Sequence, residues 1–87
     1  MKKFLSEMTF SEVYEFIETK YNEFSKISLY LNERGKNMLD TYSIILDKAE
    51  FCNTNEELVN DINRVIERFD ENNAIVKNLK GFIKQIG

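Results

Sequence analysis

The fold class follows from one stretch of the chain, residues 10–52, which reads FSEVYEFIETKYNEFSKISLYLNERGKNMLDTYSIILDKAEFC. Apolar side chains recur in it at every seventh residue, and a mostly apolar layer lies three or four residues after each of them. This spacing is typical of a helix face that packs against other helices, whereas a strand would alternate with a period of two. The main register consists of Phe10, Ile17, Phe24, Leu31, Met38, Ile45 and Cys52.

A second apolar series covers the C-terminal part of the chain with alternating steps of four and three residues. The chain also has no Pro and only three Gly, although a sandwich or barrel of this size needs many turns built from those residues. Both observations predict an all-α fold. The second series consists of Leu58, Ile62, Val65, Phe69, Asn72, Val76, Leu79, Ile83 and Ile86.

Two capping boxes mark where the helices begin. Thr9 is followed three residues later by Glu12, and Thr54 by Glu57. In such a box the Thr hydroxyl accepts from a backbone N–H of the first turn while the Glu carboxylate reaches back to the cap. We therefore expect one helix to begin near residue 10 and another near residue 55, within a single domain of residues 1–87 whose first eight residues form a flexible segment.

The polar segment of residues 32–37, which contains Gly35, leaves two architectures open. The seven-residue register continues through it, and an interior Gly costs a helix only about 1 kcal/mol. The favoured architecture is a long antiparallel hairpin, with one helix over about 10–52 that kinks at Gly35 and a second over about 55–86, assembled as a homo-oligomeric bundle. The alternative is a three-helix bundle split at Gly35, because Gly often caps a helix end.

Asn72 is the one polar residue in the second apolar series. A polar side chain in a helical seam can fix register and oligomeric state, which makes Asn72 a candidate register-setting residue of the core. Because residues 70–73 are all polar, the alternative is a bend between helices over 55–70 and 74–86.

The residue inventory argues against an enzyme, a cofactor or a metal site. The chain has no His, one Cys, no Gly-rich phosphate loop and no nucleophile motif. The three acidic residues Glu12, Glu15 and Glu18 lie off the apolar register and are better explained as a solvated face than as metal ligands. Cys52 ends the first register, and we interpret it as a small core residue. The alternative is a reactive thiol, which needs a nearby cation or helix N-terminus, because the helix expected to begin near residue 55 places an N-terminus close by.

The charge and hydropathy pattern also excludes several kinds of partner. The net charge is -3 and no basic stripe is present, so direct binding to nucleic acid is not expected. No apolar run is long enough for a signal peptide or a membrane span, so we expect a cytoplasmic protein.

Aromatic residues make up 13% of the chain and widen the apolar stripe of the first series beyond a two-helix seam. Exposed apolar surface of that width usually marks a binding site. We expect a second copy of the chain to cover it, as a dimer or a larger assembly, and another protein to bind there. The predicted interaction surface consists of Tyr14, Phe16, Tyr21, Phe24, Tyr30 and Tyr42.

The leading functional hypothesis is therefore a small, non-enzymatic helical protein that inhibits or regulates another protein by binding it. Its small size and its richness in Lys, Asn, Ile, Phe and Tyr, whose codons are rich in A and T, favour a phage or mobile-element origin. One alternative is an oligomer that sequesters a small anionic ligand such as a nucleotide. Another is a structural coiled-coil component of a larger assembly.

Overall fold

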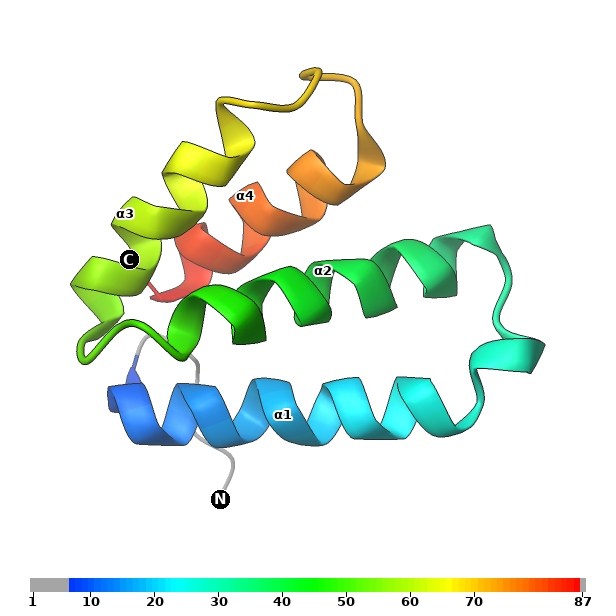
Figure 1. Ribbon diagram of the computed structural model, residues 1–87, viewed down its shortest axis with the longest axis horizontal. Coiled ribbons are helices and arrows are strands. Elements are labelled where there is room, and N and C mark those ends of the chain that lie inside the picture. The colour runs from blue at the N-terminus through cyan, green and yellow to red at the C-terminus, as the bar shows by residue number, and fades with distance from the viewer. Residues whose placement is uncertain (1–6, 87) are drawn as a thin grey trace.

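The computed structural model describes residues 7–86, and these residues form helices and no strand. The predicted all-α fold class is confirmed. Figure 1 shows the elements in chain order, which are α1 (Phe10–Lys26), the short 3-10 helix η2 (Ser28–Tyr30), α2 (Glu33–Ala49), α3 (Asn55–Ile66) and α4 (Ala74–Ile86).

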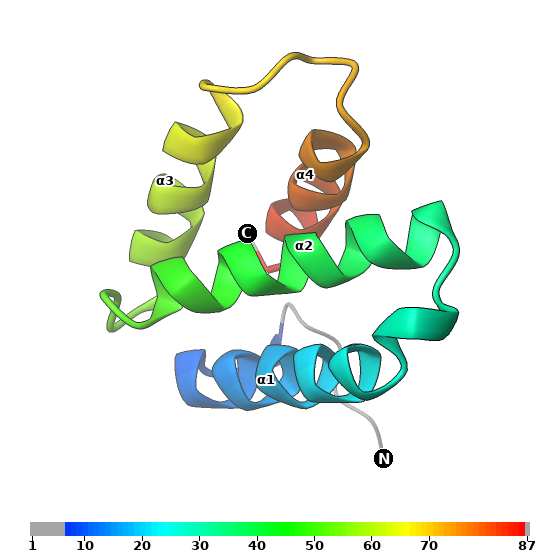
Figure 2. The same cartoon turned by 45° about the vertical axis from the view of Figure 1, so that its right-hand side comes forward.

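Helix α2 occupies the centre of the fold. It packs against α1 on one side and against the antiparallel pair of α3 and α4 on another, so α1 and α4 contact α2 more extensively than they contact each other. Figure 2 shows the α3–α4 pair crossing over α2 while α1 runs antiparallel beneath it. The arrangement is therefore two helical hairpins, α1–α2 and α3–α4, of which the second packs across α2 of the first.

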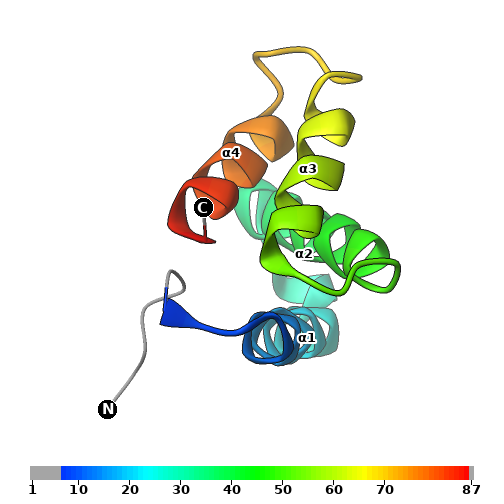
Figure 3. The ribbon, with the colours of Figure 1, turned by 90° about the vertical axis from the view of Figure 1, so that its left-hand side faces the viewer.

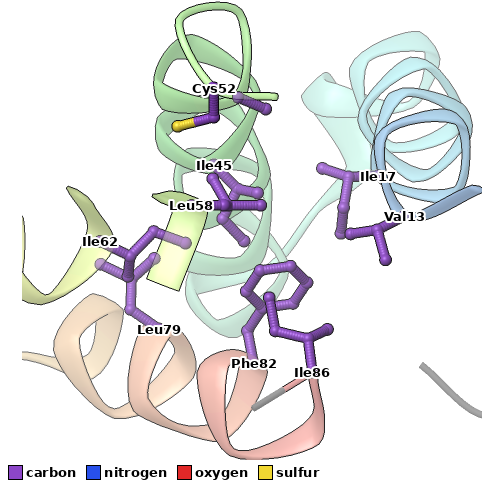
Figure 4. Packing of buried hydrophobic residues seen from close by; sticks show 10 residues of the cluster. Val13, Ile17, Ile45, Cys52, Leu58, Ile62, Leu79, Phe82 and Ile86 are labelled. Carbon is purple, nitrogen blue, oxygen red and sulfur yellow. The ribbon is translucent and has the colours of Figure 1, made fainter. Parts of the chain in front are cut away.

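The core lies where the four helices face one another. Helix α2 contributes Thr41, Ile45 and Ala49, each at most 2% exposed, spaced by four residues along a single stripe. Figure 4 shows side chains from the other helices converging around Ile45 of this stripe. They include Val13 and Ile17 from α1, Leu58 and Ile62 from α3, and Leu79, Phe82 and Ile86 from α4.

The expected continuous helix over residues 10–52 is wrong, and so is the alternative split at Gly35. The chain leaves the α-helix after Lys26 and re-enters it at Glu33. Asn32 sets the second boundary, because its side-chain oxygen accepts a hydrogen bond of 2.9 Å from the backbone N–H of Gly35. Gly35 thus lies in the first turn of α2, with no left-handed backbone conformation. The seven-residue register persists across a break because α1 and α2 face the same core.

The expected helix over residues 55–86 is also divided. Residues 67–73 connect α3 to α4, and Asn72 is exposed there, so its assignment to the core register is wrong. Its backbone N–H instead donates to the Asp70 carboxylate at 3.0 Å, and the Asn73 side-chain oxygen accepts from the N–H of Ile75 at 2.8 Å at the start of α4. These short polar side chains bind backbone groups of the bend, in agreement with the alternative of two shorter helices.

Both predicted helix starts are confirmed. Thr9 and Glu12 form the complete capping box, with bonds of 3.3 Å and 3.2 Å, and the Thr54 hydroxyl accepts from the Glu57 N–H at 3.1 Å. Of the N-terminal segment, Met8 packs against the core and its carbonyl accepts from the Asn55 side chain at 3.0 Å. The expectation of flexibility for residues 1–6 falls outside the described residues.

The two described glycines give a test of this helix assignment. Gly81 lies in the middle of α4, and a Cβ added there would meet no atom within 4 Å, so Gly81→Ala should stabilise the protein by about 0.5–1 kcal/mol. A Cβ at Gly35 would lie 2.9 Å from Leu31 Cδ2 and 3.1 Å from Leu31 Cβ, so Gly35→Ala should gain less. Guanidinium unfolding at one protein concentration measures both. A larger gain at Gly35 than at Gly81 would contradict the assignment.

Candidate functional site: a groove and an exposed corner

A groove of about 330 Å³ lies where α1, α2 and α4 come together. One end of the space between α1 and α4 is filled by core side chains, since Val13 lies near Phe82 and Ile86 (Figure 4). Figure 3 shows α1 and α4 on adjacent sides of α2 with no helix between them. The groove is therefore the part of the α1–α4 interface that the chain itself does not fill.

The groove has apolar and aromatic walls. Phe16 of α1, Met38 and Tyr42 of α2, and Phe82 of α4 line it together. Phe82 is buried, whereas the other three are only half-buried and leave apolar surface open to solvent. The aromatic ring of Phe24 meets the ring of Tyr42 edge-on at 5.5 Å between centroids, which holds the Tyr42 wall in place.

A hydrogen bond from Asn78 of α4 to the buried Thr41 of α2 connects the two helices at the base of the groove. The Thr41 side chain, 1% exposed, donates to the Asn37 carbonyl at 2.7 Å and accepts from the Asn78 amide at 3.3 Å. The hydroxyl is thus used both as donor and as acceptor, as a buried polar group requires. The bond also directs the Asn78 side chain along the groove lining.

Charged groups lie at both edges of the groove. On the α1 side, the Lys20 ammonium lies 5.8 Å from the centre of the Phe16 ring and 3.7 Å from the Glu23 carboxylate. Burial, together with the negative charge of Glu23, raises the pKa of Tyr42 above its usual value. On the α4 side, Lys77 lines the groove directly.

The six predicted surface aromatics do not form one stripe. Only Phe16 and Tyr42 line the groove. Tyr21 lines a separate hollow with Asp47 and Glu50 of α2. The single wide stripe expected on the first series is not formed, because the break after α1 turns α2 back against α1. The two halves of the first series therefore face each other.

The remaining predicted aromatics lie elsewhere. Tyr14 packs against the core and its ring lies 6.4 Å from that of Phe10. Tyr30, by contrast, is 87% exposed on η2, next to Leu29 at 92% and close to Ile27 at 49%. We call Ile27, Leu29 and Tyr30 the η2 corner. It is a three-residue apolar projection at the turn between α1 and α2 (Figure 1).

Sequence reasoning missed the α4 side of the groove and most of the η2 corner. Lys77, Asn78 and Gly81 carry no motif, and their proximity to Phe16 depends on how α4 crosses α2. For the corner a signal existed, since Leu29 and Tyr30 are adjacent apolar residues that one helix face cannot both bury.

Cys52 lies in the turn after α2, away from the groove, and is 6% exposed. Its Sγ lies 3.2 Å from the Asp61 carboxylate, to which the thiol donates. Burial, the hydrogen bond to Asp61 and the negative charge of that group raise the pKa of Cys52 to about 11. The thiol is therefore protonated at neutral pH, which favours the structural interpretation over a reactive one.

Two further features bear on the kind of site. Within residues 7–86, no three His, Cys, Asp or Glu side chains gather as a metal ion would require. None of the helices in this part of the chain has the length and apolar character needed to cross a bilayer.

A comparison of the chain with protein-family models, curated proteins and solved structures finds no match.

The raised pKa of Cys52 predicts a loss of stability in alkali. The unfolded thiol ionises near pH 8.5 to 9, whereas the folded thiol stays protonated until about pH 11. Its contribution is therefore complete below pH 8.5 and is lost as the pH rises through 11, by about 3 kcal/mol. Urea unfolding at pH 8, 9, 10 and 11 measures this loss. Cys52→Ala should show a shallower decline over the same range, and an equal decline would contradict the account.

Proposed function

We propose that the chain is a non-enzymatic helical protein that binds another protein through the η2 corner. The observation that carries the proposal is the exposure of three large apolar side chains, two of them at 87% or more, on one short turn. Burying a side chain of this size contributes about 1.5–3 kcal/mol. Burial of the η2 corner against another protein would therefore favour binding. Apolar projections of this kind are typical of protein interfaces.

The local geometry supports binding with little loss of conformational freedom. The η2 turn is held by backbone hydrogen bonds from Tyr30 to Ile27 at 2.9 Å and from Leu31 to Ser28 at 3.4 Å. Helices on both sides fix its ends, and the Asn32 cap starts α2 immediately after it. A side chain that is already ordered costs less entropy on binding, which favours affinity.

The chemistry of the titratable groups agrees with a binding role. Cys52 and Tyr42 both have pKa values shifted upward, away from neutral pH, where a general base or nucleophile operates. The absence of His removes the commonest acid–base group. The proposal accordingly extends to an inhibitor or regulator of a protein target, of the kind that phages and mobile elements encode.

One specific observation favours the second candidate, a binder of a small anionic ligand. The groove combines the Phe16 and Tyr42 rings with Lys77 and Asn78, groups that suit stacking and an anion. However, a single lysine lines the groove, and a phosphate group usually needs more than one positively charged side chain. We place the coiled-coil candidate last, because the longest described helices, α1 and α2, have 17 residues each.

Photo-crosslinking tests the role of the η2 corner. A photoreactive phenylalanine analogue replaces Tyr30 in one version of the protein and Phe51 in another, in cells of the source organism. Phe51 is a matched control because it is 79% exposed in the turn between α2 and α3. We expect position 30 to give a discrete adduct with a different protein, and Leu29→Asp in the same chain to abolish it.

The control at position 51 distinguishes crosslinking to a specific partner from nonspecific crosslinking of exposed apolar residues. Position 51 should give no adduct of the same mass. Adducts of equal yield from both positions, or adducts of position 30 that survive Leu29→Asp, would overturn the proposal.

A further inference from the structure

The groove, with the charges on its two walls, is a second candidate binding surface and is separate from the η2 corner. Helix α4 carries Lys77, Lys80 and Lys84 and no acidic residue, although the whole chain has a net charge of -3. Helix α1 carries four glutamates and two lysines. One groove is thus bounded by a basic helix on one side and an acidic helix on the other.

A second copy of the chain fits this pattern. We propose that two chains form a symmetric dimer in which each groove faces the other, with α1 of one chain against α4 of its partner. A two-fold interface uses the same patch on both chains, so the acidic helix of each meets the basic helix of the other, twice. A partner with a uniform charge would be attracted to one wall and repelled by the other.

Burial of the apolar lining favours association, and the charges at the groove edges determine how the two chains are oriented. Phe16, Met38 and Tyr42 are half-buried in the single chain and become covered when the two grooves meet. Gly81 lies on the same wall with nothing within 4 Å of its added Cβ, so a partner helix has room to approach the α4 backbone. A chain of 87 residues has a small core, and dimerisation is a common way to enlarge one.

Charge reversal at the groove edges tests the proposed orientation. Lys77 of α4 lines the groove, and Glu23 lies seven residues after the groove-lining Phe16 on the same face of α1. Both side chains are exposed, so reversing their charges should leave the fold intact, as circular dichroism can verify. In sedimentation equilibrium, the wild-type chain should be a dimer at micromolar concentration. Glu23→Lys and Lys77→Glu should each weaken the dimer by about tenfold, because every reversal acts at two symmetric places.

Mixing the two variants gives the decisive result. The Glu23→Lys chain has lost the net negative charge of α1, and the Lys77→Glu chain has a less basic α4. In an equimolar mixture the introduced lysine at position 23 of one chain faces the introduced glutamate at position 77 of the other while the second contact keeps its native charges, so a heterodimer of nearly wild-type affinity should form. Glu18→Lys and Lys80→Glu change the same charges on the same helices away from the groove lining and should change the affinity by less than about twofold.

Three results would overturn the dimer. They are a wild-type chain that stays monomeric at several hundred micromolar, a mixture without rescue, and control variants that weaken association as strongly as the groove variants. A small molecule or a foreign peptide as the true occupant of the groove would give the first of these. None of them bears on the η2 corner, whose crosslinking test uses a different surface.

Discussion

The fold depends on one constraint, which is that α2 alone provides the surface for all three other helices. Its stripe of Thr41, Ile45 and Ala49 has modest side chains at two of three positions, so neighbouring helices can approach closely. The pair of α3 and α4 takes one sector of α2 and α1 takes another. Because α1 and α4 both rest on α2, they meet fully only near Val13 and Phe82, and the groove is what remains between them.

This arrangement separates two surfaces with different physical character. The η2 corner is convex, almost fully exposed and apolar, and it exists because α1 must turn sharply to pack against α2. The groove is concave, half-buried and edged by opposite charges. A convex projection suits insertion into a pocket of a different protein, whereas a patch edged by both signs of charge can pair with its own copy across a two-fold axis.

The sequence predicted the helical class and the helix starts because local chemistry determines both. The apolar spacing and the Thr9 and Thr54 caps need no knowledge of tertiary structure. The helix breaks were harder to predict, because the apolar register continues across residues 27–32. The local signal for the start of α2 is the side chain of Asn32, which caps the helix by accepting from the backbone N–H of Gly35. Asn72 was assigned to the core for the same reason, since a bend that preserves the register resembles a continuous helix.

The site was predicted only in part, because it depends on helix crossing. Phe16 and Tyr42 were recognised as surface aromatics, but Lys77, Asn78 and Gly81 reach the groove only through the packing of α4 on α2. The most direct test of the account is an isotope-filtered nuclear Overhauser experiment on an equimolar mixture of 13C-labelled and unlabelled chains. We predict intermolecular contacts between the Phe16 and Tyr42 rings of one chain and α4 of the other. A spectrum in which these rings contact α4 only within their own chain would contradict the account.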